Sequence, residues 1–280
     1  MQRERVAEDV YVFTSERYAQ VTAGVVATSE GVILIDTLLF PDETRQIKAF
    51  IETRLAMPVR YVINTHYHAD HSYGTFLFPE AMVIAHARCF ELLDTRGRAG
   101  LEQSKANSSE LNDVEIVLPG LVFQSGIFTL TLGAKTLQLW ASPGHSPDSI
   151  VCLVREDRVL FAADTVMAIP YFVDGDYDDF VMSLEAMQNN TFENIVQGHG
   201  DVILRGEIEQ KLASDLHYLA ALKKHVEAAP RDDIDSMLRT ITLERCGKSR
   251  TPLSEHVQQL HQANIRVLHR RLGERSATEA

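Results

Sequence analysis

The sequence predicts an α+β fold in which two sheets pack together and carry helices on their outer faces. Two blocks of strand-like segments, within residues 10–86 and 121–198, are each followed by helical patterns. Strands and helices do not alternate strictly, which favours two packed sheets. From Glu207 onward the signal is helical. We therefore expect a two-sheet domain over residues 1–205 and a C-terminal helical region over residues 206–280 packed on it.

The first block contains short apolar runs that are rich in β-branched residues and bounded by turn residues. We expect strands at residues 10–15, 23–29, 32–37, 60–65 and 82–86. A helix is predicted from Pro41 to about Leu55, because apolar residues recur there at helical spacing. A short helix over residues 87–97 should end at Gly97, and residues 104–119 read as polar and irregular.

The second block is also sheet-like, and turn signals separate its strands at the spacing typical of sheet proteins. We expect strands at residues 121–125, 127–133, 135–142, 149–155, 158–164 and 194–198. One helix is predicted over residues 179–189. Helices should then cover residues 207–229, 232–246 and 254–272, with breaks at Pro230 and Pro252 and a frayed tail at residues 276–280.

The composition, with 45% hydrophobic and 24% charged residues, is that of an ordinary folded protein. The formal net charge is −12, so the average surface repels polyanions and we expect no nucleic-acid partner. The sequence has neither a membrane-spanning apolar run nor a secretory signal pattern, so with Met1 as the natural start we expect a cytoplasmic protein. Cys89, Cys152 and Cys246 are odd in number and widely spaced, which predicts reduced, buried thiols.

The segment from Thr65 to Gly74 contains three histidines and an aspartate within six positions, directly after a predicted strand. His66 and His68 project to the same side of an extended backbone, because side chains two residues apart share a face. Asp70 and His71 fall at the start of the next element, which we expect to be a helix. Imidazole nitrogen and carboxylate oxygen are ligands for zinc, iron or manganese, so the segment predicts a metal site.

This HxHxDH pattern resembles the signature of the metallo-β-lactamase superfamily, and the resemblance extends over about residues 10–205. The later motifs of that family have counterparts in this chain. His145 lies on a loop after a strand, Asp164 ends a strand, and His199 follows a short strand between two glycines. The resemblance implies a four-layer αββα sandwich, here with the C-terminal helical extension.

The resemblance also implies a centre of two metal ions that share one bridging carboxylate. Its ligands would be His66, His68 and His145 for the first ion, Asp70, His71 and His199 for the second, and Asp164 for both. Two such cations lower the pKa of a shared water and give a bridging hydroxide nucleophile, while one of them polarises the substrate. Zinc is the first expectation, and iron or manganese at one or both positions stays open.

Residues around the ligands are expected to orient the histidine rings by accepting their free N–H protons. Asp36, at the end of a predicted strand, is the first candidate, and Thr65 and Thr165 could contribute. His86 is expected to have a supporting or structural role and not to bind metal. Asp70 could orient the nucleophile in addition to binding metal.

The loop over residues 167–178 is rich in aromatic residues and follows the bridging aspartate. Ile169, Tyr171 and Phe172 could line an apolar substrate wall, or this loop could pack on the C-terminal helices. Tyr171 is a candidate catalytic residue that could donate a hydrogen bond to a developing oxyanion. The C-terminal helices could cap the active site or form a homodimer surface, although burial of their leucines within the chain is the simpler expectation.

Departures from subgroups of the family narrow the function. Aspartate at position 164, where one large group of true β-lactamases has cysteine, argues against antibiotic hydrolysis. Flavodiiron proteins have glutamate where this chain has His68. Glyoxalase II resembles the ligand set, but its basic and aromatic cluster, which binds glutathione, has only a weak counterpart in Tyr218, Lys223 and Lys224. We expect the two lysines to form a solvated helix face.

The sequence therefore predicts a zinc-dependent hydrolase (EC class 3) that cleaves a small-molecule ester, lactone or thioester. Two alternatives remain open within the same superfamily. One is a mononuclear iron oxidoreductase that resembles the sulfur dioxygenases, and the other is a β-lactam or phosphodiester hydrolase. The metal content distinguishes the iron oxidoreductase from the zinc hydrolase. The substrates that are turned over distinguish a β-lactam or phosphodiester hydrolase from an ester, lactone or thioester hydrolase.

Overall fold

The structure is a computed structural model that describes residues 1–230, 233–248 and 254–278. Its first sheet has seven strands in the order β1 (Gln2–Ala7), β2 (Val10–Thr14), β3 (Thr22–Thr28), β4 (Gly31–Ile35), β5 (Val59–Ile63), β6 (Met82–His86) and β7 (Leu121–Phe123). Its second sheet has six strands in the order β13 (Ile203–Leu204), β12 (Asn194–Gln197), β11 (Val159–Ala163), β10 (Ile150–Val154), β9 (Lys135–Ala141) and β8 (Ile127–Leu132).

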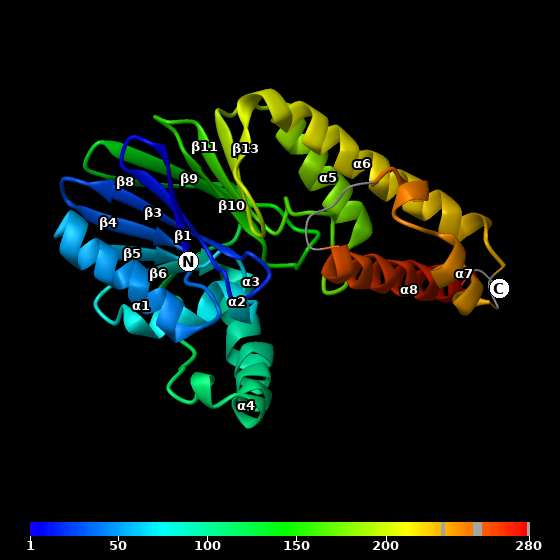
Figure 1. Cartoon of the computed structure of the whole chain (residues 1–280), viewed down its shortest axis with the longest axis horizontal. Coiled ribbons are helices and arrows are strands. Elements are labelled where there is room, and N and C mark those ends of the chain that lie inside the picture. The colour runs from blue at the N-terminus through cyan, green and yellow to red at the C-terminus, as the bar shows by residue number, and fades with distance from the viewer. Residues whose placement is uncertain (231–232, 249–253, 279–280) are drawn as a thin grey trace.

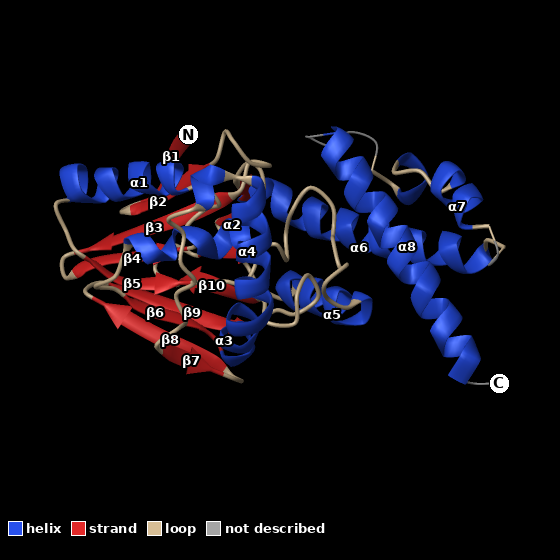
Figure 2. Ribbon diagram, turned by 90° about the horizontal axis from the view of Figure 1, so that it is seen from below, coloured by secondary structure: helices blue, strands red, loops and turns tan. Residues whose placement is uncertain are grey.

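The helices lie outside the two sheets (Figures 1 and 2). They are α1 (Pro41–Phe50), α2 (Ala69–Ser72), α3 (Ala87–Leu92), α4 (Arg98–Asn107), α5 (Tyr177–Gln188), α6 (Arg205–Ala228), α7 (Ile234–Thr240) and α8 (Ser254–Thr278). A π-helical segment, Ile51–Leu55, continues α1, so the helix predicted from Pro41 to Leu55 is confirmed. In Figure 1, α4 projects below the sheets, and α6 to α8 gather at the right of the molecule.

Buried apolar side chains define the four layers. One cluster fills the space between the sheets and includes Val26 and Ile33 of the first sheet and Leu139 and Phe161 of the second. A second cluster packs α1, through Ile47, on the outer face of the first sheet. A third packs α5, α6 and α8 on the outer face of the second sheet. The predicted αββα sandwich is therefore confirmed, and hydrophobic burial on both faces of each sheet maintains it.

The C-terminal helices share a core with the second sheet. Leu212, Leu219 and Leu222 of α6 are buried, and Leu216 is partly buried against the same cluster. This leucine stripe thus packs within the chain, which was the simpler expectation. The division of the chain at residue 205 stays a prediction, as does a homodimer.

The ends of the chain show two differences from the predictions. Strand β1 was not predicted, because its residues Gln2–Ala7 are mostly polar and exposed, and only backbone pairing with β2 defines it. Helix α8 reaches Thr278 where a frayed tail was expected, and residues 279–280 lie outside the described residues. The break predicted at Pro252 also lies outside them.

Helical structure after β6 extends further than predicted. The helix does not end at Gly97, because this glycine has helical dihedral angles (φ −60°, ψ −49°) and leads directly into α4. The good helix formers between residues 98 and 107 then continue the helix into a stretch predicted to be irregular. A short 3₁₀ turn, Ser109–Leu111, follows.

Two further predictions concern the whole chain. Cys89, Cys152 and Cys246 are all free thiols in buried positions, as expected. Among the described helices, none combines the length and the apolar character needed to cross a membrane.

Candidate metal centre

The predicted ligands lie at one edge of the sandwich, where strands from both sheets end. β4 and β5 are parallel, and so are β11 and β12, so each pair has its carboxyl ends on the same side. The two sheets meet at this edge, where the Thr22 amide donates to the Gly198 carbonyl oxygen at 2.9 Å. Loops that are far apart in the sequence, around His66, Asp164 and His199, are thereby brought together.

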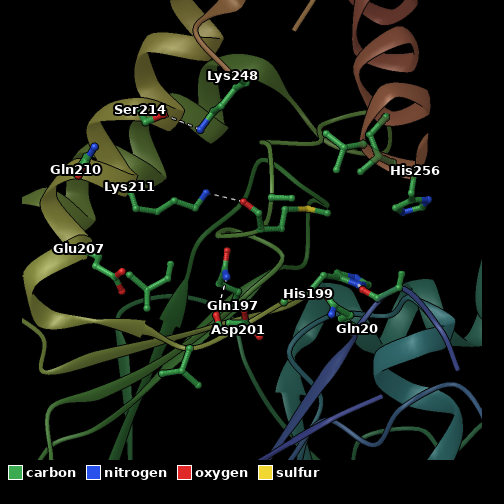
Figure 3. A pocket seen from close by; sticks show the side chains of 18 of the residues that line it. Gln20, Gln197, His199, Asp201, Glu207, Gln210, Lys211, Ser214, Lys248 and His256 are labelled. Carbon is green, nitrogen blue, oxygen red and sulfur yellow. Dashed lines mark hydrogen bonds between the residues drawn. The ribbon is translucent and has the colours of Figure 1, made fainter. Parts of the chain in front are cut away.

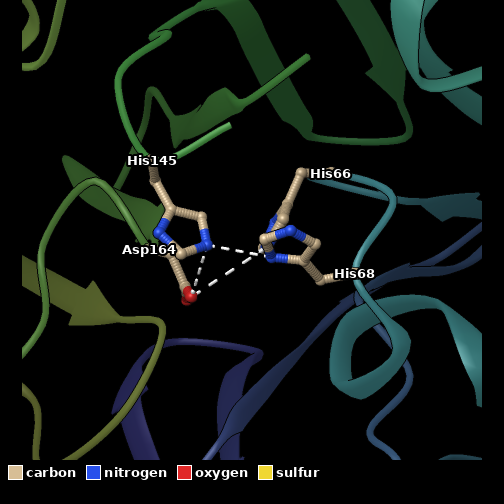
Figure 4. A group of neighbouring side chains, drawn as sticks. All are labelled: His66, His68, His145 and Asp164. Atoms are coloured by element: carbon tan, nitrogen blue, oxygen red, sulfur yellow. Dashed lines mark hydrogen bonds and ion pairs between the residues drawn. The ribbon is translucent and has the colours of Figure 1, made fainter. Parts of the chain in front are cut away.

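The first cluster contains His66, His68 and His145 with Asp164 (Figure 4). His68 Nδ1 lies 3.1 Å from His66 Nε2 and 3.0 Å from His145 Nε2. Asp164 Oδ2 lies 3.1 Å from His145 Nε2 and 4.0 Å from His66 Nε2. Three ring nitrogens and one carboxylate oxygen thus converge on one small volume, which is the donor set of a tetrahedral zinc site.

The second cluster contains Asp70, His71 and His199. Asp70 Oδ2 lies 3.3 Å from His199 Nε2 and 3.8 Å from His71 Nε2. Short helix α2 carries both Asp70 and His71, as predicted, while His199 comes from the loop after β12. This cluster offers two nitrogens and one oxygen.

Asp164 lies between the clusters and faces both. Its Oδ1 is 3.1 Å from His71 Nε2, and its Oδ2 is 3.4 Å from His199 Nε2 as well as close to His145. His71 Nε2 and Asp164 Oδ1 are buried polar atoms without a hydrogen-bond partner among the described residues. Such atoms are costly to bury, and a cation between them would satisfy both. The residues therefore fit a bound metal at each cluster.

All five histidines have their outward ring nitrogen held by a fixed acceptor. The acceptors are the Thr65 hydroxyl for His66 (3.1 Å), the carboxylates of Asp174 for His68 (3.2 Å) and Asp36 for His71 (2.8 Å), and the carbonyl oxygens of Tyr171 for His145 (2.8 Å) and Ala19 for His199 (2.9 Å). Each ring thus donates outward and directs its other nitrogen toward the centre.

Two histidines of the first cluster, His66 and His145, have lowered pKa values. Burial, with the neighbouring His71 and His68, holds the pKa of His66 well below its usual range. Burial also lowers the pKa of His145 to about 4, against the opposing charge of Asp164. A neutral imidazole is the form that binds a metal, so these two rings need lose no proton at neutral pH.

The second cluster behaves in the opposite way. Burial acts to lower the pKa of His199, but Asp164 and Asp70 outweigh it and raise that pKa to about 10. The same carboxylates, with Asp36, hold the pKa of His71 well above its usual range despite its burial. Protons on these rings balance the buried carboxylates, and a metal dication would displace them and take over this role.

Unusual backbone geometry supports the centre. Asp36 and Ala163 have positive φ values of 58° and 44°, and they occur directly after β4 and directly before Asp164. Such left-handed residues persist only where the surrounding structure holds them, and they often occur at functional sites. A side chain at Gly198 would collide with the Asp164 carboxylate, so only glycine lets the His199 loop approach so closely.

The supporting residues are partly as predicted. Asp36 accepts hydrogen bonds from the Thr65 amide (2.8 Å) and hydroxyl (2.7 Å) as well as from His71, which confirms its orienting role and that of Thr65. Thr165 bonds Ser142 and no ring, so its proposed contribution is wrong. His86 caps α3 by accepting the Arg88 amide proton, which confirms the structural role.

The aromatic loop packs on the C-terminal helices. Ile169 and Phe172 are fully buried, and Asn264 of α8 bonds the backbone on both sides of Tyr171, at Pro170 and Phe172. The alternative in which Ile169 and Phe172 line a substrate wall is therefore wrong. Tyr171 is half-buried, with its ring centroid 5.9 Å from that of His145.

Tyr218, Lys223 and Lys224, the weak counterpart of the glyoxalase II cluster, do not converge on a common site among the described residues. Tyr218 is fully buried, with its hydroxyl against His261 and Asn264. Lys223 lies over the Tyr177 ring and near Asp178, and Lys224 is exposed. The two lysines are on a helix face, as expected.

Two aspartates that the sequence analysis missed support the HxH segment. Asp174 accepts hydrogen bonds from His68, from the Tyr67 hydroxyl (2.5 Å) and from Arg96 (2.8 Å). The buried Asp148 accepts the Tyr67 amide proton at 2.8 Å and so ties the His145 loop to the HxH segment. Neither follows a recognisable motif, because their partners are distant in the sequence.

A cavity of about 530 Å³ adjoins the centre (Figure 3). In Figure 3, α6 with Lys211 lines the cavity at the left, α8 with His256 at the upper right, and His199 with Gln20 at the lower right. Since His199 belongs to the second cluster, a ligand in this cavity could reach the metal centre. The C-terminal helices therefore form a wall beside the centre.

We predict that Asp174→Asn weakens metal binding about 10- to 100-fold, because a neutral amide accepts the His68 N–H more weakly than a carboxylate. The metal retained per chain after dialysis against buffers of graded free zinc checks this. Asp113→Asn, at an exposed aspartate away from the centre, should leave retention unchanged. Equal retention in wild type and Asp174→Asn would contradict the orienting role.

The comparisons with known proteins agree with this geometry. The family model described as "Metallo-beta-lactamase superfamily" matches residues 17–207. The "Beta-lactamase-like protein 2 homolog" of Caenorhabditis elegans is 25% identical over 74% of this chain and 67% of its own length. "Thioesterase pkgB" of Emericella nidulans is 28% identical over 73% of this chain and 52% of its own length, so the chain spans about half of this relative.

A solved structure shows the same fold. The "Metallo-beta-lactamase from Pontibacter korlensis" aligns with a TM-score of 0.63 and 20% identity, covering 78% of this chain and 98% of that one. At this identity the likeness concerns the fold alone. The family model, in contrast, spans every predicted ligand from His66 to His199. The chain therefore belongs to the metallo-β-lactamase superfamily.

Proposed function

We propose that this protein is a dinuclear metal-dependent hydrolase that cleaves a small-molecule ester, lactone or thioester. The observation that carries the proposal is the Asp164 carboxylate, which has His145 against one oxygen and His71 against the other. A single carboxylate between two donor clusters is suited to hold two cations a few ångströms apart. This arrangement favours two ions over one.

Two bound cations would lower the pKa of a shared water and polarise a substrate carbonyl oxygen. The residues of the chain prepare the site for this. Their outward hydrogen bonds fix the rings, so the donors need little rearrangement. Asp70, whose pKa lies below its usual range because His71 and His199 outweigh its burial, stays ionised and can orient a nucleophile.

Zinc is the metal we propose for both positions. The donor set is imidazole nitrogen and carboxylate oxygen without thiolate, which suits zinc and also iron or manganese. Metal identity therefore forms part of the test below.

The substrate class rests on the relatives and on the cavity. One relative carries the name thioesterase, and the wall beside the centre mixes apolar residues such as Met167 and Leu260 with polar ones. A small organic molecule that has both apolar and polar parts fits such a surface. The net charge of −12 disfavours nucleic acid.

Two tyrosines at the centre can donate hydrogen bonds. Burial and then the charge of Asp174 raise the pKa of Tyr171, so its hydroxyl is protonated at neutral pH. The charge of Asp70, with burial and the charge of Asp164, raises the pKa of Tyr18 to about 12. We propose that Tyr171 donates to the developing oxyanion, and Tyr18 is a second donor that the sequence analysis missed.

The experiment that tests the function is a substrate panel with the metal content measured. The panel contains p-nitrophenyl esters, lactones, thioesters, phosphodiesters and nitrocefin. We expect turnover of an ester, lactone or thioester by protein that holds two zinc ions per chain, and its loss after chelation. Turnover confined to nitrocefin or phosphodiesters would contradict the substrate class. One redox-active iron with oxygen consumption would support the sulfur-dioxygenase alternative instead.

We predict that Tyr171→Phe lowers kcat on the best panel substrate by roughly 10- to 1,000-fold, with KM little changed, because an oxyanion donor acts mainly in the transition state. Steady-state kinetics check this. The matched control is Tyr11→Phe, at a ring that packs on Phe50 at the outer face of the first sheet. An unchanged kcat in Tyr171→Phe would remove its hydroxyl from the mechanism and leave only its carbonyl contact with His145.

A further inference from the structure

We infer that the cavity beside the metal centre binds an anionic group of the substrate, a carboxylate or a phosphate, through Lys211 and Lys248. This inference rests on the proposed hydrolase function and narrows its substrate to an ester or thioester that carries a negative charge. Both lysines line the cavity whose other side is formed by His199 (Figure 3). A substrate could therefore contact the lysines and the metal centre at the same time.

The two lysines share a single carboxylate. Lys211 Nζ and Lys248 Nζ each lie 2.6 Å from a different oxygen of Asp215. Lys211 also donates to the Met167 carbonyl oxygen at 2.6 Å, and Lys248 to the Ser214 hydroxyl at 2.9 Å. With two ammonium groups on one carboxylate, this cluster has one positive charge in excess.

The excess charge is largely removed from water. The Asp215 side chain is 1% exposed and the Lys248 side chain 8%, while that of Lys211 is 19% exposed toward the cavity. Burial lowers the pKa of Lys211, with Asp215 opposing this shift. A buried charge without a counterion is unfavourable, and an anion in the cavity would balance it.

Donor capacity also remains for a ligand. An ammonium group has three N–H donors, and the described residues accept two from each of these lysines. One donor on each lysine is thus available within the part of the chain that the structure describes. Two such donors are suited to the oxygens of one carboxylate or phosphate.

The other residues that line the cavity determine which way an anionic ligand would be oriented in it. Glu207 and Asp201 lie apart from Lys248 in the cavity, and Glu207 accepts the Leu204 amide proton at the start of α6 (Figure 3). Their negative charges disfavour an anion at that end. Val257 and Leu260 of α8 add apolar surface to the lining of the cavity. The anionic end of a ligand is therefore expected at the lysines, with its scissile bond toward His199.

A structural role for the lysines makes a different prediction. If the cluster only joined α6 to the Met167 loop, one lysine on Asp215 would balance the charge, and the second would be unnecessary. Loss of a purely structural lysine would also reduce turnover of charged and neutral substrates alike. The preference for charged over neutral substrates therefore distinguishes a substrate-binding role of the lysines from a purely structural role.

The experiment compares mono-p-nitrophenyl esters of succinic, adipic and suberic acid with p-nitrophenyl esters of equal chain length that end in a methyl group. We expect a higher kcat/KM for at least one charged ester. In Lys211→Met and in Lys248→Met this preference should fall about tenfold or more, with neutral esters little affected. The matched control is Lys224→Met, at an exposed lysine of α6, the helix that also carries Lys211.

The absence of any charged-ester preference in wild type, or its survival in both variants, would overturn the inference. So would an equal fall on charged and neutral esters, which indicates a structural role. Calorimetric titration of adipate and of inorganic phosphate tests binding without turnover and separates the two anions. If no ester is hydrolysed but an anion binds to the wild type and not to the variants, the result contradicts the proposed hydrolase function and supports the anion site.

Discussion

The metal centre depends on one set of hydrogen bonds, in which five imidazole rings each donate their outward N–H to a fixed acceptor. These bonds fix the orientation of every ring and direct its second nitrogen toward the space around Asp164. The acceptors lie in loops that adjoin strands of both sheets. The donor geometry can therefore exist only when the sandwich has closed.

Two parallel strand pairs and one buried glycine bring the ligand loops of the two sheets together. β4 with β5 and β11 with β12 end at the same edge, and Gly198 lets the His199 loop come against Asp164. The C-terminal helices contribute in another way, because α8 holds the Tyr171 loop through Asn264 and α6 forms the cavity wall with Lys211. The metal centre and the wall of the adjoining cavity thus share a single scaffold.

The sequence predicted what is encoded locally. The apolar, β-branched runs predicted the central strands. The HxHxDH segment, with His145, Asp164 and His199, predicted a set of metal donors that the fold brings together. Features that depend on distant contacts were not predictable. Asp174 contacts His68 across 106 residues of sequence, and Lys248, in a loop, contacts Asp215 of α6 across 33 residues. Strand β1 was missed for a related reason, since its polar side chains carry no burial pattern.

The central claim is that Asp164 joins two metal ions, and anomalous diffraction at the zinc absorption edge tests it most directly. The measurement uses crystals of the full chain grown with zinc. We expect two anomalous peaks, one among His66, His68 and His145 and one among Asp70, His71 and His199, with the Asp164 carboxylate between them. A single peak, or two peaks with Asp164 in contact with only one, would contradict the account.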